Sequence, residues 1–334
     1  MGKSAVTILD VANRAGVSAT TVSQALNGKR PVNAKTKALI QQAIEELGYV
    51  PSYTASHMKA GSSGLLGCYV ADITQDFTAF MLKGIEKALK GSGYSLIFVS
   101  GTDIGTNHDE VISYFRKYNV DGLISIHHLS SVDSSSLSGA YGIPTVMANS
   151  ENPKFNCVLS SNREAGGLVA DHLYAQGVRK PVFLGGPESR LSVTRRLFGF
   201  SKRFSTLGIS IADDCVRFGD FTYESGYQMT KDLVESAVSF DGIFCANDYI
   251  AIGAVKYLQE KGYQIPSDVK IVGFDDRDVS LYCSIPLTTV NQNLESIGEL
   301  ALRRLLEMVR TGDTSIKVQY SRPELIVRES SVVR

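Results

Sequence analysis

Polar and aromatic side chains follow several apolar segments of the chain, each at the point where a buried strand would end. They are Asp72–Phe77, Asn149, Gly186–Arg196, Asn247-Asp248 and Asp275-Asp276. In open parallel sheets, ligands bind at the carboxyl ends of the strands. Carboxylates and amides can hydrogen-bond to ligand hydroxyls, and aromatic rings can stack on an apolar ligand face. These residues therefore predict one cleft for a small polar ligand.

A second set of side chains has the chemistry needed to read DNA bases. One predicted helix face carries small, uncharged residues, namely Ala19, Thr20, Ser23, Gln24 and Asn27. Glutamine can bond adenine through two hydrogen bonds, Ser and Thr can donate or accept, and Ala or Thr methyls can contact thymine. The same periodicity also fits an amphipathic helical hairpin on any soluble protein, and the residues alone leave that alternative open.

The helices that would position this face are predicted from caps and periodicity. Ile8, Val11, Ala12 and Ala15 recur on one helix face. Thr7 is the expected N-cap, with Asp10 favourable in the first turn, and Gly16 is the expected end of the helix.

Two more short helices complete this unit. Ser18 is expected to cap the second helix, whose inward face is predicted to be Val22, Ala25 and Leu26. The third helix runs from Ala34 to Leu47 and is capped by Asn33. Three short helices that share an apolar face make a minimal DNA-binding headpiece. Residues 52–59 can then form one or two helical turns, followed by a Gly/Ser linker at residues 60–64.

From Leu65 onward, apolar runs of strand length alternate with helical stretches. The runs are 65–71, 94–100, 122–126, 144–148, 181–186, 242–246 and 269–274; the helical stretches are 80–91, 109–118, 163–176, 194–206, 223–238, 249–261 and 294–310. Continuous apolar strands that alternate with helices predict doubly wound parallel sheets. The number of units exceeds one ordinary sheet, so the fold class is α/β with two lobes.

Composition narrows the class of protein. The chain has 334 residues and no net charge, but residues 1–60 hold seven Lys/Arg and three Asp/Glu, a net of +4 on this part. A basic head on a body of net −4 suits contact with phosphates by the head only. No apolar run reaches the length of a membrane span, and no signal peptide is apparent, so we expect a cytoplasmic protein. The five cysteines are expected to be reduced core thiols.

Motifs for cofactors and catalysis are missing. The sequence has no dinucleotide fingerprint, P-loop or nucleophile elbow. His127-His128 lacks a nearby carboxylate or Cys that would complete a metal set, so a loop or lobe-interface role is preferred. Asp275-Asp276 lacks a nucleophile or metal partner. We therefore expect no cofactor, no metal and no enzymatic activity.

The chain resembles, almost from end to end, the bacterial transcription regulators typified by the lactose and purine repressors. The segments that carry the resemblance are TILDVANRAGVSATTVSQALNGKRPVNAKTKALIQQAIEELGYVPS, SYTASHMKAGSSGLLG, GGPESRLSVTRRLFGF, GDFTYESGY, CANDYIAIGA, VGFDDRD and PLTTVNQNLESIGELA. The resemblance implies a helix-turn-helix headpiece, a hinge helix and a two-lobed body like that of periplasmic binding proteins. The expected domains are 1–51, 52–63 and 64–334; within the body, the lobes are 64–160 with 291–320, and 161–290 with 321–334.

The resemblance also implies roles for headpiece residues. Base-reading positions fall on Ala19, Thr20 and Gln24, and many family members have Arg where this chain has Gln24. The implied phosphate contacts are Thr7, Ser18, Thr21, Ser23, Asn27 and Thr36. Met58 stands where the family usually wedges a Leu into the minor groove, and Met is apolar but flexible.

For the body, the resemblance implies effector contacts. These are Arg190, Arg196, Phe221, Asn247 and Asp275, together with Phe77 and Asn149. The usual Asp-Asn pair before the EAGG helix is Ser161-Asn162 here, so a frequent carboxylate contact is absent. Arg196 could instead form a plain salt bridge between lobes, and Phe221 could be core.

The resulting hypothesis is a homodimeric, ligand-responsive repressor of a pseudo-palindromic DNA operator. Crossing segments near Ser160, Asn291 and Arg322 would act as hinges when an effector closes the cleft. Pocket composition favours a sugar or sugar phosphate as effector, and a purine or nucleoside comes second.

Overall fold

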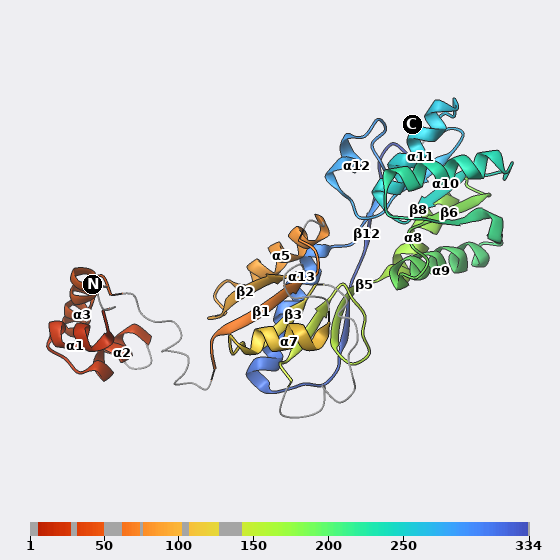
Figure 1. Cartoon of the computed structure of the whole chain (residues 1–334). Helices are drawn as coiled ribbons and strands as arrows, with labels where there is room; N and C mark the ends of the chain where they lie inside the picture. The colour runs from red at the N-terminus through yellow and green to blue at the C-terminus, as the bar shows by residue number, and fades with distance from the viewer. Residues whose placement is uncertain are drawn as a thin grey trace.

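The computed structural model describes residues 6–27, 32–49, 62–73, 76–101, 107–126 and 142–332. Its first unit is a headpiece of three helices, α1 (Ile8–Ala15), α2 (Ala19–Asn27) and α3 (Ala34–Leu47) (Figure 1). Thr7 and Asp10 form a capping box at the start of α1, in which the Thr7 backbone N–H donates to Asp10 Oδ2 at 2.8 Å. Gly16 ends α1 in the left-handed conformation with φ of 68°. Both predicted ends of this helix are confirmed.

The other predicted caps are confirmed as well. Ser18 Oγ accepts a hydrogen bond from the Thr21 backbone N–H at 3.1 Å at the start of α2. Asn33 Oδ1 accepts from the Thr36 backbone N–H at 2.8 Å at the start of α3. These bonds satisfy N–H groups that the first turn of each helix leaves without intrahelical partners.

Two assignments of α2 side chains to faces need correction. Val22 is fully buried in the headpiece core, but Leu26, which was expected beside it, is 38% exposed. Leu26 lies four residues after Val22 and hence roughly 40° further round the helix, which moves it off the buried stripe. Ala19, expected on the outer face, packs partly against the headpiece core. The polar outer face of α2 is therefore narrower than predicted, because Ala19 turns partly into the core and the apolar Leu26 lies partly at the surface.

Asp121 holds the chain where it enters the body. Ser62 Oγ donates to Asp121 Oδ2 at 2.5 Å, and the backbone N–H groups of Ser63 and Gly64 donate to the same carboxylate at 2.9 Å. The last three residues of the expected Gly/Ser linker are thus bound to the body. Residues 52–61, which include Met58, lie outside the described residues.

Six parallel strands form the first sheet, in the order β11-β5-β4-β3-β1-β2. They are β1 (Leu65–Val70), β2 (Ser95–Ser100), β3 (Gly122–Ser125), β4 (Thr145–Ala148), β5 (Asn156–Ser160) and β11 (Val318–Ser321). Helices α5 (Asp76–Leu89) and α13 (Leu294–Thr311) contribute to the core on one face, and α7 (His108–Arg116) contributes on the other. We call this part the N-terminal lobe.

Two glycines let α5 and α13 approach each other closely. A Cβ atom at Gly84 would lie 1.9 Å from the backbone oxygen of Glu295, and one at Gly298 would lie 2.0 Å from that of Met81. Real Cβ atoms cannot approach a backbone oxygen so closely, so glycine is required at both helix crossings.

Four parallel strands form the second sheet, in the order β7-β6-β8-β9. They are β6 (Pro181–Gly185), β7 (Val216–Phe218), β8 (Gly242–Cys245) and β9 (Lys270–Val272). Helices α8 (Asn162–Ala175) and α9 (Leu191–Thr206) lie on one side of this sheet, and α10 (Tyr223–Glu235) and α11 (Asp248–Glu260) lie on the other (Figure 1). The short helix α12 (Asp278–Tyr282) follows β9. We call this part the C-terminal lobe.

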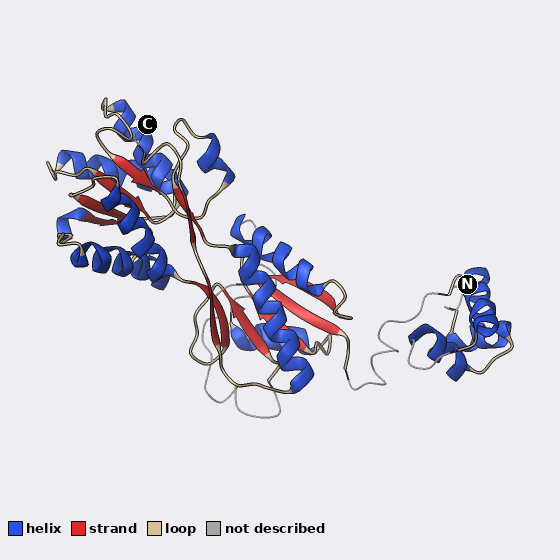
Figure 2. Cartoon of the chain, turned by 180° about the vertical axis from the view of Figure 1, so that it is seen from behind, coloured by secondary structure: helices blue, strands red, loops and turns tan. Residues whose placement is uncertain are grey.

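Three segments cross between the lobes (Figure 2). The first joins β5 to α8, the second joins β10 (Thr289–Asn291) to α13, and the third joins β11 to β12 (Glu324–Ile326). The segments bind one another: the Ser161 backbone N–H donates to the Ser321 oxygen at 3.2 Å, and Asn293 Nδ2 donates to the Arg322 oxygen at 2.7 Å. The crossings lie at the positions expected for hinges, and their role as hinges stays a prediction.

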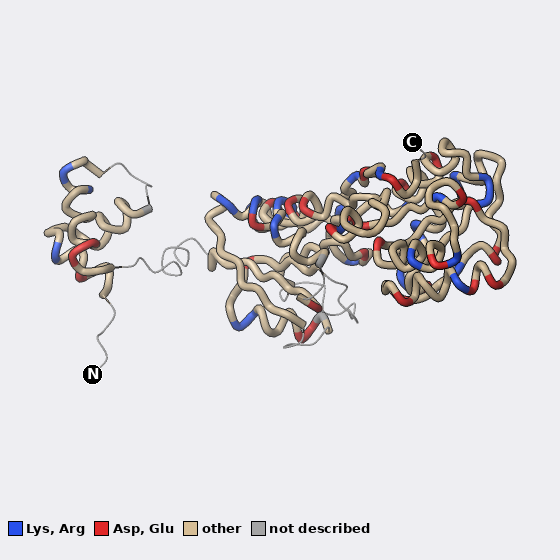
Figure 3. Tube along the Cα trace, turned by 90° about the horizontal axis from the view of Figure 1, so that it is seen from above, with Lys and Arg blue, Asp and Glu red and all other residues tan. Residues whose placement is uncertain are grey.

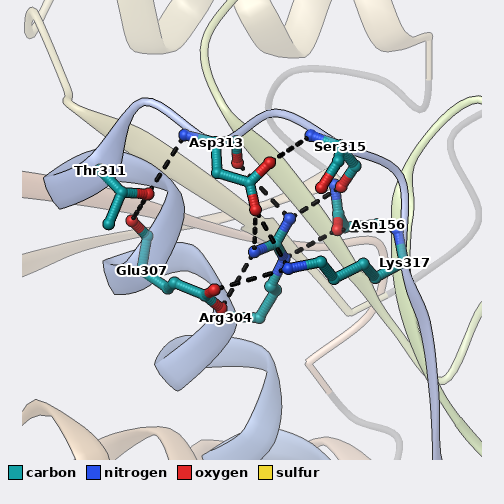
Figure 4. A network of polar contacts seen from close by, with 7 residues as sticks. All are labelled: Asn156, Arg304, Glu307, Thr311, Asp313, Ser315 and Lys317. Atoms are coloured by element: carbon teal, nitrogen blue, oxygen red, sulfur yellow. Dashed lines mark hydrogen bonds and ion pairs between the residues drawn. The ribbon is translucent and has the colours of Figure 1, made fainter.

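A buried arginine fixes the end of α13 to the sheet (Figure 4). The side chain of Arg304 is 1% exposed and donates to Asn156 Oδ1 of β5 at 2.8 Å. It also donates to the Ser315 oxygen at 2.7 Å and pairs with Asp313 at 3.2 Å, both in the loop that leads to β11. Lys317 pairs with Asp313 at 3.0 Å. This network positions β11 against β5.

The predicted fold class is confirmed, but some elements were missed. Strands β5, β7, β10, β11 and β12 were not predicted, because they are short or carry polar residues. Helix α5 begins at Asp76 instead of Phe80. All five cysteines are free, as predicted, and three of them are buried. Among the described residues, no helix is both long and apolar enough to span a membrane.

Candidate DNA-reading surface and effector site

The outer face of α2 has no charged side chain and is partly exposed. Thr20 is exposed, and Gln24, one helical turn later, is half-buried. Ser23 is half-buried on the same side. This face is opposite Val22, so the three polar side chains could reach a groove while the apolar side of α2 stays in the headpiece core. Asn27 ends α2, and its side chain lies outside the described residues.

Most hydroxyls predicted to contact phosphates lie at helix starts, whereas that of Ser23 lies within α2. Ser18 and Thr21 exchange a side-chain hydrogen bond of 2.8 Å at the start of α2. Thr36 lies in the first turn of α3. Helix starts attract phosphates because their N–H groups point outward. Thr7 differs, since its hydroxyl donates to Asp10 Oδ2 at 2.7 Å and would have to exchange that bond for one to DNA.

The charge of the headpiece is unevenly distributed. Its described residues carry three basic side chains, Arg14, Lys35 and Lys37, and three acidic ones (Figure 3). Arg14 is moreover paired with Glu46. The basic excess predicted for the head therefore comes from Lys3, Lys29, Arg30 and Lys59, which lie outside the described residues.

Arg196 is the buried cation of the candidate effector site. It lies on α9, is 5% exposed, and its Nε donates to Asn162 Oδ1 at 2.8 Å. Its Nη1 donates to the backbone oxygen of Ala246, and its guanidinium lies 3.5 Å from the ring centre of Phe274. Burial lowers the pKa of Arg196 to about 10, against the attraction of Asp275 and Asp248. The group therefore stays charged at neutral pH.

Asp275 is the carboxylate next to this cation. Gln292 Nε2 donates to Asp275 Oδ1 at 2.5 Å, and Arg277 Nε lies 3.7 Å from Asp275 Oδ2. Burial raises the pKa of Asp275, while Arg196 and Arg277 oppose that rise. Asp275 and Asp276 both have positive φ, 106° and 53°. Strained backbone of this kind persists where the surrounding structure holds it and is frequent at functional sites.

Asn247 and Phe221 adjoin these charged groups. Asn247 caps α11, with its Oδ1 accepting from the Ile250 backbone N–H at 2.8 Å, and is 5% exposed. Its Nδ2 lies 3.4 Å from the Phe221 backbone oxygen. The Phe221 ring lies against Gly186, where a Cβ would be only 2.3 Å from it. Phe221 also packs partly against the core of the lobe, which is the alternative role considered for it, and its contact with an effector stays a prediction.

Two buried residues of this site were not among the predicted effector contacts, although Asp248 was expected in the cleft. Gln292 is 5% exposed, and its Oε1 has no hydrogen-bond partner among the described residues. Asp248 is fully buried; it accepts from the Thr289 hydroxyl at 2.6 Å and from the Arg277 backbone N–H at 2.8 Å. Burial, and then the charge of Asp275, raises the pKa of Asp248 to about 7. Asp248 was visible beside Asn247 in the sequence, whereas nothing local marked Gln292.

The remaining predicted residues are placed differently. Arg190 is exposed at the N-cap of α9. Phe77 and Asn149 lie in the N-terminal lobe, in α5 and after β4, and Phe77 packs partly against the core there. The structure thus places Arg196, Asn247 and Asp275 in the C-terminal lobe, where the charges of Arg196 and Asp275 influence each other. His127 and His128 lie outside the described residues, and no metal-binding group of His, Cys, Asp or Glu occurs among those described.

Two protein families match the chain. Bacterial regulatory proteins of the lacI family match residues 7–52, which include the helices of the headpiece. A periplasmic binding protein-like domain matches residues 170–331, which include all four strands of the second sheet.

Relatives match over nearly the whole chain. The HTH-type transcriptional repressors PurR of Mannheimia succiniciproducens and Haemophilus influenzae are each 32% identical, over 97% of this chain and 98% of theirs. A lac repressor dimer bound to operator and the anti-inducer ONPF has a TM-score of 0.83 at 26% identity, over 99% of this chain and 100% of that one. A complex of the transcriptional regulator CelR with cellobiose has a TM-score of 0.69 at 27% identity, over 97% and 99%. The chain belongs to the lacI family of bacterial regulatory proteins.

Proposed function

We propose that this protein is a ligand-responsive repressor that binds operator DNA through α2. The observation that carries this is the joining of two parts in one chain: a headpiece with the polar face of Thr20 and Gln24, and a body with a buried Arg196–Asp275 site. Relatives named as repressors, which match from end to end, support it. Ala19, Thr20 and Gln24 would read bases, and the helix starts would contact phosphates.

The DNA-binding form is proposed to be a homodimer in the cytoplasm. A protein dimer with two-fold symmetry presents two headpieces, which match the half-sites of a pseudo-palindrome. The lac repressor, which is similar over the whole chain, is a dimer in its complex with operator. In this arrangement residues 1–51 form the headpiece, residues 52–63 the hinge with Met58 as minor-groove wedge, and residues 64–334 the body.

We propose a purine base as effector, ahead of the sugar that pocket composition first favoured. The name PurR, which denotes a purine repressor, is carried by relatives 32% identical to this chain. Phe221, whose ring lies against Gly186, offers a ring face for a planar base. Asp275, Arg196 and Gln292 Oε1, which has no hydrogen-bond partner among the described residues, offer polar contacts. A sugar is the second candidate, because CelR, at 27% identity, binds cellobiose.

DNA recognition is tested by selecting binding sequences from random DNA with the intact chain. A pseudo-palindrome should emerge, and affinity should fall steeply with salt. Gln24→Ala should lose about 1–3 kcal/mol of discrimination at one base pair of each half-site. Gln41→Ala is the matched control, since Gln41 is exposed on α3 and pairs with Glu45. Binding without sequence preference, or equal preference in both variants, contradicts the proposed function.

The effector class is tested by thermal unfolding with hypoxanthine, guanine, cellobiose and glucose 6-phosphate. A ligand present at 100 times its Kd adds about 2.7 kcal/mol of stability, which a melting curve resolves. Stabilisation by a purine alone supports the first candidate, and stabilisation by a sugar alone reverses the order. Operator binding that responds to neither class rejects both candidates.

A further inference from the structure

Arg195 of α9 reaches out of the C-terminal lobe to the N-terminal lobe. It pairs with Glu151, which lies between β4 and β5, and the two side chains are only 28% and 30% exposed. The hydrogen bond to Glu151 raises the pKa of Arg195 above its ordinary value. Arg195 thus makes an ion pair with a residue of the opposite lobe.

Two other ion pairs of the body each lie within one lobe. Lys83 pairs with Glu295 between α5 and α13, both in the N-terminal lobe. Arg203 pairs with Asp171 between α9 and α8, both in the C-terminal lobe. A pair within one rigid lobe is unaffected when the lobes move relative to each other. The Arg195–Glu151 pair, in contrast, must break or rearrange when they do.

The position of Arg195 connects this pair to the effector site. Arg196 is the next residue of α9 and points to Asn162, Ala246 and Phe274. Successive side chains of a helix diverge by roughly 100°, so one turn can direct one guanidinium into the pocket and the other across the lobes. Asn162, the partner of Arg196, is itself at the first crossing, where its Nδ2 donates to the Ser160 oxygen at 3.2 Å.

We propose that the Arg195–Glu151 pair is a latch that stabilises the observed arrangement of the lobes and so regulates opening of the effector site. Only the regulatory consequence of the latch rests on the proposed function, because the latch itself can be observed without DNA or effector. A partly buried ion pair of this kind is expected to change an equilibrium by about threefold to tenfold. An effect of this size can change how strongly the effector alters operator binding, and it still allows the lobes to move.

The test is hydrogen–deuterium exchange of the full chain without DNA or ligand, followed by mass spectrometry of peptides. Glu151→Gln and Arg195→Gln should each accelerate exchange about threefold to tenfold at the crossing segments, including residues 291–293. The swapped pair, Glu151→Arg with Arg195→Glu, should restore the wild-type rates within about twofold. Asp171→Asn, which breaks the ion pair to Arg203 within one lobe, is the matched control and should leave the crossing segments unchanged.

Residues 291–293 make the result decisive, because neither Arg195 nor Glu151 is paired with them. Faster exchange confined to residues 149–155 and 191–196 would show a local contact and overturn the latch. Unchanged exchange in the single variants, or a swapped pair that does not recover, would overturn it as well. If the latch is observed but no operator is selected, only the proposed function fails.

Discussion

Asp248 offers a quantitative test of how burial acts at the candidate effector site. It is fully buried beside Asn247, and its carboxylate accepts from Thr289 and from the Arg277 backbone. Asp248→Asn keeps the shape: the amide oxygen can accept from Arg277, and the amide N–H can donate to the Thr289 hydroxyl, which rotates. The substitution therefore removes a titrating charge and preserves the hydrogen bonds.

The size of the effect follows from the pKa. The pKa of Asp248 is about 7 in the folded chain, against 3.8 for an unperturbed carboxyl. Because the folded state holds the proton more tightly, its advantage is complete below pH 3.8 and is lost as pH rises through about 7. Integration between pH 5 and 8.5 gives the wild type a loss of about 2–3 kcal/mol relative to Asp248→Asn.

The assay is urea unfolding followed by circular dichroism at pH 5, 7 and 8.5. Asp248→Asn should gain stability relative to the wild type at each step to higher pH, since only the wild type ionises at this position. Asp232→Asn, an exposed position on α10, is the control and should follow the wild-type profile. Parallel profiles for Asp248→Asn and the wild type would refute the argument that burial raises this pKa.

Three further outcomes are expected. Asp275→Asn should abolish the effect of the effector on operator affinity and leave operator binding itself within about twofold, as gel-shift titrations can check. A response that survives this substitution would show that the effector site lies elsewhere. Gly298→Ala should cost about 1–3 kcal/mol because its Cβ would meet Met81 at 2.0 Å, whereas Gly167→Ala, with no atom within 4 Å, should be neutral or stabilising in thermal unfolding. Arg304→Met should cost about 1–3 kcal/mol, because Asn156 Oδ1 and the Ser315 oxygen lose their hydrogen bonds to the guanidinium; an unchanged stability in urea unfolding would show that β11 is held by other contacts.

The sequence determined the features that depend on neighbouring residues. Thr7, Ser18 and Asn33 were identifiable as caps because each bonds to an N–H three residues later. Gly16 was identifiable as a helix end because it adopts positive φ without steric cost. The alternation of apolar runs and helical stretches was sufficient to predict two parallel sheets, since such strands are buried on both faces.

Only the tertiary structure decided which distant residues meet. Gln292 reaches Asp275 because β10 brings the second crossing beside the end of β9, and nothing within a few residues of Gln292 indicates this. Arg195 and Glu151 meet across the lobes although 44 residues separate them in the sequence. Leu26 was misassigned because a small difference in angle around a helix decides burial only once neighbouring helices are in place. Local hydrogen bonds are fixed by adjacent residues, whereas a site built from several crossings depends on how the whole chain packs.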